Sequence, residues 1–365
     1  MNTKKLIISI IVLCLNCSFG HTAGLKKNNV SQTFSNPLFS KVGPDPWALL
    51  QDGKYYYMHT IQDSLVLWVT KDITNVRNAR RKTIWLPKDS KNAKDLWAPE
   101  IHYINGKWYV YYAADDGNSD NHQLYVLENS NKDPLKGNFV LKGRISTDKD
   151  NNWAIDGSVF ENKGKWYLVW SGWQTRRVDV ETQCIYIAAL SNPWTLSSKR
   201  VLISKPEFEW ERKYINKNGW TPSHKIFVNE GPQPLLSPRG KYIHIAYSAS
   251  GCWTPYYALG LLSAKTSDNL LDLKSWQKSA KPVFVQSPVN GVFGTGHNSF
   301  FKSPDGKEDY ILYHGRDTET DPPGKGDTRT PRIQKFEWNK NDYPIFGIPL
   351  PTSQKLLKPS GTIFK

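Results

Sequence analysis

The segment NGKWYVYYAA at residues 105–114 is one of five similar segments in this 365-residue chain. The other four are DGKYYYMHT at 52–60, KGKWYLVWSG at 163–172, RGKYIHIAYSA at 239–249 and DGKEDYILYHG at 305–315. Glycine supplies the positive φ that a tight hairpin turn needs. The Tyr, Trp, Val and Ile residues that follow favour a strand. We therefore predict a β-hairpin at each of the five copies.

A further strand is expected on each side of the hairpin strands. Short apolar runs precede the turns: PWALLQ, PEIHYI, GSVFEN, PQPLLS and NSFFKS. Others follow the hairpins: LVLWVTKD, HQLYVLE, CIYIAAL, ALGLLSAK and RIQKFEW. Each copy thus predicts an antiparallel sheet of at least three strands, too small to bury both faces alone. Radial repetition buries them, so we predict an all-β chain that forms a single five-bladed β-propeller. A β-sandwich with hairpins that are similar by chance is the alternative.

The first twenty residues have the pattern of a signal peptide. Lys4 and Lys5 precede an apolar stretch that is too short to span a membrane, and small residues lead up to Gly20. We expect export to the periplasm or the outside of the cell, with a signal peptide at 1–20, an N-terminal extension at 21–35 and the propeller at 36–365. A lipid anchor at Cys14 or Cys17 is the less favoured alternative.

Cleavage after Gly20 would remove two lysines and lower the formal charge from +15 to +13. Such a charge suits an acidic polysaccharide such as pectin. A nucleic-acid partner is not expected, because no basic helix or RNA-binding signature is present. Two cysteines would remain, Cys184 and Cys252, and the oxidising environment allows either a disulfide or two free thiols. We expect a monomer without a transmembrane segment.

The repeat places charged residues at the centre of the predicted propeller. Residues just before the first strand of each blade should converge on one face near the axis. These residues are Asp45, Glu100, Asp156, Glu230 and His297. Clustered carboxylates push one another's pKa values apart, so one can act as a base and another as an acid. Hydrolysis of a glycosidic bond requires this division. Nearby tryptophans suit either sugar binding or packing between blades: Trp47, Trp97 and Trp153.

Five blocks of sequence resemble glycoside hydrolase family 43. They are DPW at 45–47, LWAPEIHYINGKWYVYY at 96–112, IDGSVF at 155–160, VNEGPQPL at 228–235 and GTGHNSFF at 294–301. The similarity extends over residues 40 to 350, with one block per blade in the family's order. The resemblance implies a five-bladed propeller that acts on arabinans, arabinoxylans and related side chains with inversion at the anomeric carbon.

The resemblance also implies roles for single residues. Asp45 matches the general base, Glu230 the general acid, and Asp156 the carboxylate that orients the acid and tunes its pKa. In an inverting enzyme the base and the acid lie roughly 6.5–9.5 Å apart. His297 matches an axial histidine that, in many relatives, helps to hold a calcium ion or an ordered water. No cofactor is required.

Other residues are assigned to substrate binding. Glu100 is expected to support the pocket, with Trp47, Trp97 and Trp153 around it. Arg316 resembles an arginine that contacts the sugar in the first subsite. His314, beside Arg316, is a second candidate, although the alternation of a strand would turn every other side chain away from the pocket. Arg332 could also line the pocket, but a structural role is favoured.

The sequence SASGCWTPYYALGLL at 248–262 most resembles the corresponding part of exo-acting α-L-arabinofuranosidases and exo-arabinanases. The insert at 205–224 could wall a closed pocket, as an exo enzyme needs. The expected substrate is an arabinose-containing plant polysaccharide or oligosaccharide. A β-xylosidase, an exo-β-1,3-galactosidase and an inactive sugar-binding propeller remain the alternatives.

Overall fold

The computed structural model describes residues 32–363, apart from 89 and 177–179. The predicted signal peptide and most of the predicted N-terminal extension lie outside this part. The described residues are mainly strands. Their helices are six short 3-10 turns: η1 (Ile73–Asn78), η2 (Ser90–Asn92), η3 (Ser119–Asn121), η4 (Glu209–Glu211), η5 (Leu273–Ser275) and η6 (Pro288–Asn290). No helix among these residues is long and apolar enough to cross a membrane.

Five groups of mainly antiparallel strands follow one another along the described chain. The first contains β2 (Trp47–Gln51), β3 (Lys54–Met58), β4 (Leu65–Thr70) and β5 (Arg80–Trp85). The second contains β6 (Lys94–Ile104), β7 (Lys107–Asp115), β8 (Gln123–Asn129) and β9 (Val140–Arg144). The third contains β10 (Ala154–Asn162), β11 (Lys165–Trp173), β12 (Val180–Asn192), β13 (Thr195–Leu196) and β14 (Val201–Ser204). The fourth contains β15 (Lys225–Leu236), β16 (Tyr242–Ala249), β17 (Ala258–Lys265) and β18 (Gln277–Lys278). The fifth contains β19 (Phe293–Lys302), β20 (Asp309–Arg316), β21 (Thr330–Trp338) and β22 (Pro344–Ile345).

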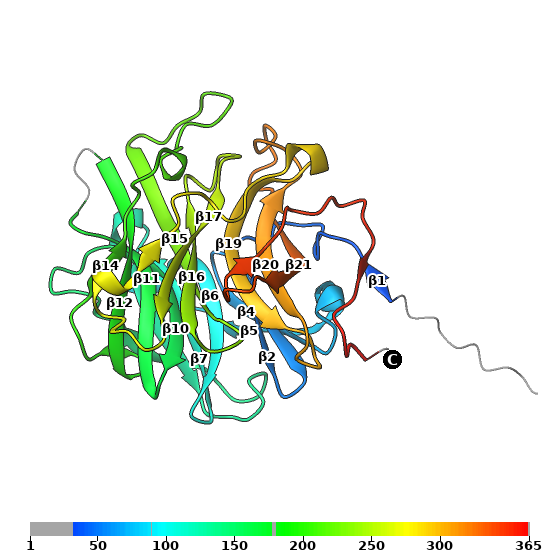
Figure 1. The fold of residues 1–365 in the computed structure, drawn as a ribbon. Helices are drawn as coiled ribbons and strands as arrows, with labels where there is room; N and C mark the ends of the chain where they lie inside the picture. Colours follow the sequence, from blue (N-terminus) through cyan, green and yellow to red (C-terminus); the bar gives the residue numbers. More distant parts are fainter. Residues whose placement is uncertain (1–31, 89, 177–179, 364–365) are drawn as a thin grey trace, which may run out of the picture. The chain divides into compact units, whose positions relative to one another are not determined.

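The first strands of the groups form a closed ring. β2 contacts β6, β6 contacts β10, β10 contacts β15, β15 contacts β19, and β19 returns to β2. Figure 1 shows the groups succeeding one another in the order of the sequence colours, from blue to orange. Within the described residues, this arrangement confirms the predicted β-propeller, with one group of strands per blade.

The repeated Gly-Lys segments form the hairpins that the sequence predicts. In the first three groups, two residues with positive φ connect the strands, as in type I′ turns: Asp52–Gly53, Asn105–Gly106 and Lys163–Gly164. Gly240 and Gly306 also have positive φ, in somewhat longer loops. Glycine is therefore required at the turn for its backbone conformation.

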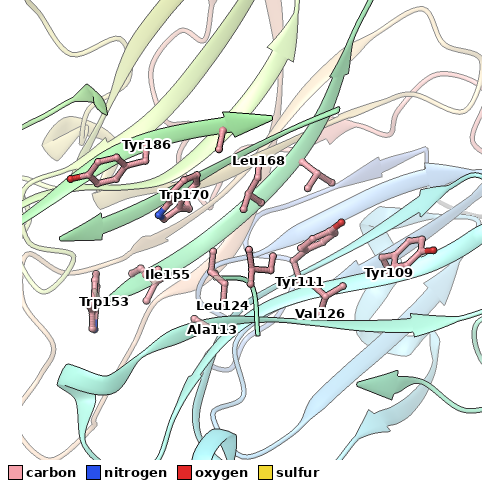
Figure 2. Close-up of a cluster of buried hydrophobic side chains, with 14 of the residues drawn as sticks. Tyr109, Tyr111, Ala113, Leu124, Val126, Trp153, Ile155, Leu168, Trp170 and Tyr186 are labelled. Atoms are coloured by element: carbon pink, nitrogen blue, oxygen red, sulfur yellow. The ribbon is translucent and has the colours of Figure 1, made fainter. Parts of the chain in front are cut away.

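Apolar side chains fill the space between neighbouring groups of strands. One cluster joins the second and third groups, and Figure 2 shows Tyr109, Tyr111, Leu124 and Val126 facing Ile155, Leu168 and Trp170. Four further clusters join the other neighbouring groups, including the fifth to the first. Each sheet thus buries both faces against its neighbours, which a sheet of four strands cannot do alone.

Two features were not anticipated. β12 and β15 extend beyond their groups and pair in parallel, so the third and fourth groups form one continuous sheet. β1 (Thr33–Phe34) pairs with β23 (Leu356–Leu357), and the Asn36 side chain exchanges two hydrogen bonds with the backbone of Ile333. These contacts fasten the beginning of the described chain to its last blade.

Candidate active site

A cavity of about 320 Å³ opens where the first strands of the five groups begin. Six of the residues predicted for the site line it: Asp45, Trp97, Trp153, Asp156, Glu230 and His297. Further lining residues come from the third strand β12 and from the connecting loops, among them Thr60, Glu181, Trp253 and Arg329. The structure thus brings together acids, a histidine, an arginine and aromatic rings that are far apart in the sequence.

A left-handed backbone residue lies within every first strand or, in the first group, two residues before it, and each is a lining residue of the cavity or directly follows one. The five residues are Asp45, Ala98, Asp156, Gly231 and His297, with φ between 43° and 57°. In the last four groups the strand pairing is irregular at this point, as at a β-bulge, which re-aims the neighbouring side chains. This conformation is costly for residues other than glycine and concentrates at functional sites.

These five residues define the true register of the repeat. They lie eight or nine residues before the turn glycine of their hairpin. Asp45, Asp156 and His297 occupy the position itself, and Glu230 directly precedes it. Glu100 lies two residues beyond Ala98, so the prediction that all five charged residues are equivalent was wrong in its register.

Glu100 and Trp47 therefore do not line the main cavity but border a smaller space beside it. Glu100 is buried, accepts a hydrogen bond from the Gln233 amide and lies 3.0 Å from Nε2 of His102. The Trp47 indole donates to the Ile101 carbonyl at 2.9 Å and packs on the His102 ring. Both side chains hold the inner strands of the first two groups and the fourth together.

Asp45 is held by contacts on both carboxylate oxygens. The Thr60 hydroxyl donates to Oδ2 at 2.7 Å, and Oδ1 lies 3.3 Å from Nδ1 of His297 and 3.4 Å from Nη1 of Arg329. Thr60 also accepts a hydrogen bond from the Ala98 backbone, which ties the first group to the second. Asp45 thus has a fixed orientation facing a permanent cation.

The electrostatics keep Asp45 ionised. Burial alone would raise the pKa of Asp45, but His297 and Arg329 more than offset it and hold the pKa well below its usual range. Burial lowers the pKa of His297, so this ring is neutral at neutral pH and Arg329 supplies the lasting positive charge. His314 accepts from the backbone N–H of Asp45 through Nδ1, which leaves its proton on Nε2.

Glu230 has the opposite character. Burial raises its pKa to about 7, the charge of Asp45 adds to this increase, and a hydrogen bond from Tyr257 limits it. The Tyr257 hydroxyl donates to Oε1 of Glu230 at 2.6 Å. Tyr257 in turn stacks on His314, with ring centroids 5.5 Å apart. Near neutral pH, Glu230 can therefore hold a proton and also release it.

Asp156 is the third carboxylate at the cavity. Its Oδ2 accepts a hydrogen bond from the Gly231 backbone at 2.9 Å, which connects it to the residue after Glu230. Burial raises the pKa of Asp156 well above its usual range, and the nearby charges of Glu230 and Asp45 raise it further. Asp45, Glu230 and Asp156 thus occupy three different electrostatic environments around one space.

Aromatic rings form one wall of the cavity. Trp97 stacks on His122 with ring centroids 3.8 Å apart, and Trp153 stacks on Trp173 at 5.1 Å. His122 is completely buried, and its two ring nitrogens lie 3.0–3.1 Å from the backbone oxygens of Ser119 and Asp95. The wall is therefore anchored from behind and gives the cavity an apolar surface with little freedom to move.

The arginine that lines the cavity is Arg329, which sequence reasoning missed. Arg316 is buried outside the lining, where Asp321 binds its guanidinium through two hydrogen bonds and the Cys252 carbonyl accepts a third. Arg332 is also buried and pairs with Asp317. Arg329 lies in the loop between β20 and β21, where the repeat gives no guide to position.

Glu181, Gln183 and Trp253 were also missed. Glu181 and Gln183 lie on the extended end of β12 and are joined by a hydrogen bond of 2.8 Å. Trp253 belongs to the SASGCWTPYY segment, which was noted for its similarity but not for a role. Cys184 and Cys252 are both free, and Cys252 lines the cavity.

The axial histidine does not by itself form a calcium site. Calcium prefers six to eight oxygen ligands, whereas His297 offers a ring nitrogen beside Asp45, whose oxygens already face Thr60 and Arg329. Across residues 32–363, with the gaps given above, no group of three or more His, Cys, Asp or Glu side chains is arranged to hold a metal ion.

The chain is similar to known proteins over most of its length. It is 38% identical over 328 residues to an extracellular exo-α-(1→5)-L-arabinofuranosidase of Streptomyces avermitilis. The aligned region covers 88% of this chain and 64% of the relative. A protein of the same name from Streptomyces chartreusis is 33% identical and covers 78% of this chain and 82% of the relative. The crystal structure of an α-L-arabinofuranosidase from Lactobacillus brevis matches with a TM-score of 0.78 and 34% identity, covering 88% of this chain and 98% of that one.

The match to the Streptomyces avermitilis protein, and to two α-L-arabinofuranosidases from Humicola insolens and Pyricularia oryzae, covers only part of each relative. The chain spans 60–64% of their length. The family model for glycosyl hydrolases family 43 matches residues 34–344, which include every residue of the cavity and, except for Ile345, all five groups of strands. The chain therefore belongs to glycosyl hydrolase family 43.

Proposed function

We propose that this chain is an exo-acting, inverting α-L-arabinofuranosidase that releases terminal arabinofuranosyl units from arabinan, arabinoxylan or pectic side chains. One observation carries the proposal: three carboxylates surround one cavity, and their environments favour different protonation states. Family membership and the names of the similar proteins support the choice of arabinose.

Asp45 is the proposed general base. As a lasting anion it accepts a proton from a water molecule, whose oxygen attacks the anomeric carbon on the face opposite the leaving group. A carboxylate with a low pKa is a weak base, but an oxocarbenium-like transition state demands little from the nucleophile. Thr60 and Arg329 fix the direction in which the carboxylate presents itself.

Glu230 is the proposed general acid. Its pKa of about 7 allows it to carry a proton at neutral pH and to give it to the glycosidic oxygen as the bond from that oxygen to the anomeric carbon breaks. Because Tyr257 donates to Oε1, the transferable proton belongs on Oε2. The products are a sugar of inverted configuration and the shortened chain, and a second proton transfer through water resets the two carboxyl groups.

Asp156 is the proposed positioning group. It binds the backbone next to Glu230 and so orients the acid, while burial and the charges of Glu230 and Asp45 raise its own pKa and favour its neutral form. Trp97 and Trp153 supply a dry wall for the bound sugar. A cavity of about 320 Å³ is at the small end of the ~300–1,000 Å³ that ligand pockets occupy. This size suits a chain end and supports exo action.

The proposed chemistry needs no cofactor. A calcium ion near His297 would have a structural role only, held through water molecules as well as protein oxygens. Treatment with a chelator tests this part: we expect unchanged activity and, if such an ion contributes, a lower melting temperature that added calcium restores.

We also propose that the protein is exported after removal of residues 1–20. The similar proteins described as extracellular support export. Mass spectrometry of the mature protein tests the cleavage site, with His21 expected at the new N-terminus. A mass increment from lipid at Cys17 would show the anchored alternative.

The activity is tested with aryl glycosides and one product analysis. We expect hydrolysis of an aryl α-L-arabinofuranoside to exceed that of the aryl β-D-xyloside and β-D-galactoside by at least roughly 100-fold in kcat/KM, a difference of about 2.7 kcal/mol. Proton NMR should show β-L-arabinofuranose as the first product. A preference for the xyloside, or initial release of the α-anomer, would overturn the proposal.

A further inference from the structure

Trp220 stands out on the surface of the protein. It is 53% exposed and is the only Phe, Tyr or Trp of the described residues to be exposed rather than buried or partly buried. Keeping an indole in water forgoes the gain of burying apolar surface, about 25 cal/mol per Å². Exposed apolar surface next to a functional site commonly marks a binding surface.

Trp220 adjoins the cavity through a second tryptophan. Its ring lies edge-on to Trp253, with centroids 6.1 Å apart and an interplanar angle of 78°. Trp253 is a lining residue of the cavity. The two indoles therefore form one aromatic surface that begins in the cavity and continues into solvent.

Hydrogen bonds clasp the two loops that carry these tryptophans. The Trp253 indole donates to the Tyr214 carbonyl at 2.8 Å, and the Asn216 side chain donates to the Trp253 carbonyl at 2.7 Å. The backbone N–H of Asn216 reaches the Trp220 carbonyl at 2.9 Å, which closes the turn around Trp220. The aromatic surface is thus formed by the fold itself and needs little ordering when a ligand binds.

Gly251 makes room for this arrangement. A Cβ atom at this position would lie 2.4 Å from the Trp253 ring, far inside van der Waals contact. The indole therefore lies directly on bare backbone. Within the insert at 205–224, Lys217 forms an ion pair with Glu319, which lies in the same loop as Arg329. The insert at 205–224, the segment at 250–257 and the loop at 317–329 are thus joined beside the cavity.

We propose that Trp220 and Trp253 form a subsite for the leaving-group side of the substrate, which binds the neutral sugar units that remain after cleavage. This inference rests on the proposed function. The carboxylates lie at the inner strands, so the sugar to be released occupies the cavity and the rest of the chain must leave it. Furanose and pyranose rings present C–H faces that pack on an indole, and Trp220 offers such a surface beyond Trp253.

The test compares substrates of increasing length in the Trp220→Ala variant. With α-1,5-linked arabinotriose and longer oligosaccharides, we expect KM to rise about 10-fold while kcat stays within about 2-fold. Ten-fold corresponds to about 1.4 kcal/mol, or about 55 Å² of covered apolar surface. With an aryl α-L-arabinofuranoside, which is too short to reach Trp220, both parameters should equal those of the wild type.

Two further variants serve as controls. Trp220→Phe keeps an aromatic face and should retain most of the wild-type KM. Leu236→Ala removes a side chain of similar exposure, 56%, at the end of β15 that is farther along the chain from Trp220. This variant should change KM and kcat for neither the oligosaccharides nor the aryl glycoside. Equal KM values for wild type and Trp220→Ala at every length, or an equal change on the aryl glycoside, would overturn the subsite. An inactive wild type on the aryl glycoside would instead refute the proposed function.

Discussion

The Tyr257 hydroxyl lies 2.6 Å from Oε1 of Glu230 and donates a hydrogen bond to it. Such a bond stabilises the ionised carboxylate and acts against burial, which raises the pKa of Glu230 to about 7. Without this bond the acid would hold its proton too firmly. The pair therefore sets the pH above which the proposed acid no longer carries its proton.

Tyr257→Phe should shift the alkaline limb of the kcat/KM profile to higher pH. Loss of the donor leaves the charge of Arg329 to oppose burial and the charge of Asp45, so the pKa of Glu230 rises, by about 0.5 to 1. The measurement is kcat/KM on an aryl α-L-arabinofuranoside between pH 4 and 10. An alkaline limb that moves to lower pH would show that Tyr257 acts on Glu230 in another way.

Arg329→Met should move both limbs upward. Arg329 lowers the pKa of Asp45 and that of Glu230, so removing its charge raises both values. Asp45 would then need a higher pH to ionise, and activity at acidic pH should fall most. Arg329→Lys keeps a positive charge and is the matched control. If Met and Lys at this position gave the same profile, charge would not be the cause.

Glu230→Gln should change stability in a pH-dependent way. The folded pKa of about 7 exceeds the ordinary value of 4.5, so between these pH values the unfolded chain releases a proton that the folded protein keeps. The free energy of unfolding of the wild type therefore falls as pH rises through this window. Glutamine does not titrate, so its melting temperature relative to wild type should be higher at pH 8 than at pH 5. A constant difference would contradict the raised pKa.

Asp45→Asn should slow hydrolysis strongly for all leaving groups. The change removes the base; it also removes a charge that raises the pKa of Glu230, but it leaves the proton donor in place. An acidic phenol and a sugar should therefore both be released about 10²–10⁴ times more slowly. Steady-state rates on an aryl glycoside and on arabinobiose provide the comparison, with circular dichroism as the check on folding. A loss confined to one substrate class would exclude the proposed role.

The fold could be predicted from the chain because its signals are local and repeated. Glycine at a turn and alternating aromatic residues report on a hairpin directly, and five copies imply the radial arrangement that buries both sheet faces. The parallel pairing of β12 with β15 had no such signal. It depends on how far two strands run past their blades, which is decided by tertiary packing.

The residues of the candidate site could likewise be predicted only where the repeat marks their position. Asp45, Asp156, Glu230 and His297 lie at or next to a repeated position and could be found by counting back from the turn glycine. Glu100 was wrongly treated as equivalent to these residues. The left-handed residue of its strand is Ala98, which is not polar and could not be recognised in the sequence. Arg329, Tyr257 and Trp253 belong to loops or later strands, whose course the repeat does not describe.

The central claim, that Glu230 protonates the leaving oxygen, is tested most directly by the leaving-group dependence of Glu230→Gln. The variant should lose about 10²–10⁴-fold in kcat/KM with arabinobiose, whose leaving oxygen needs a proton. With a dinitrophenyl α-L-arabinofuranoside, whose leaving group departs as a stable anion, it should remain within about 10-fold of the wild type. Equal losses on both substrates would contradict the assignment of Glu230 as the general acid.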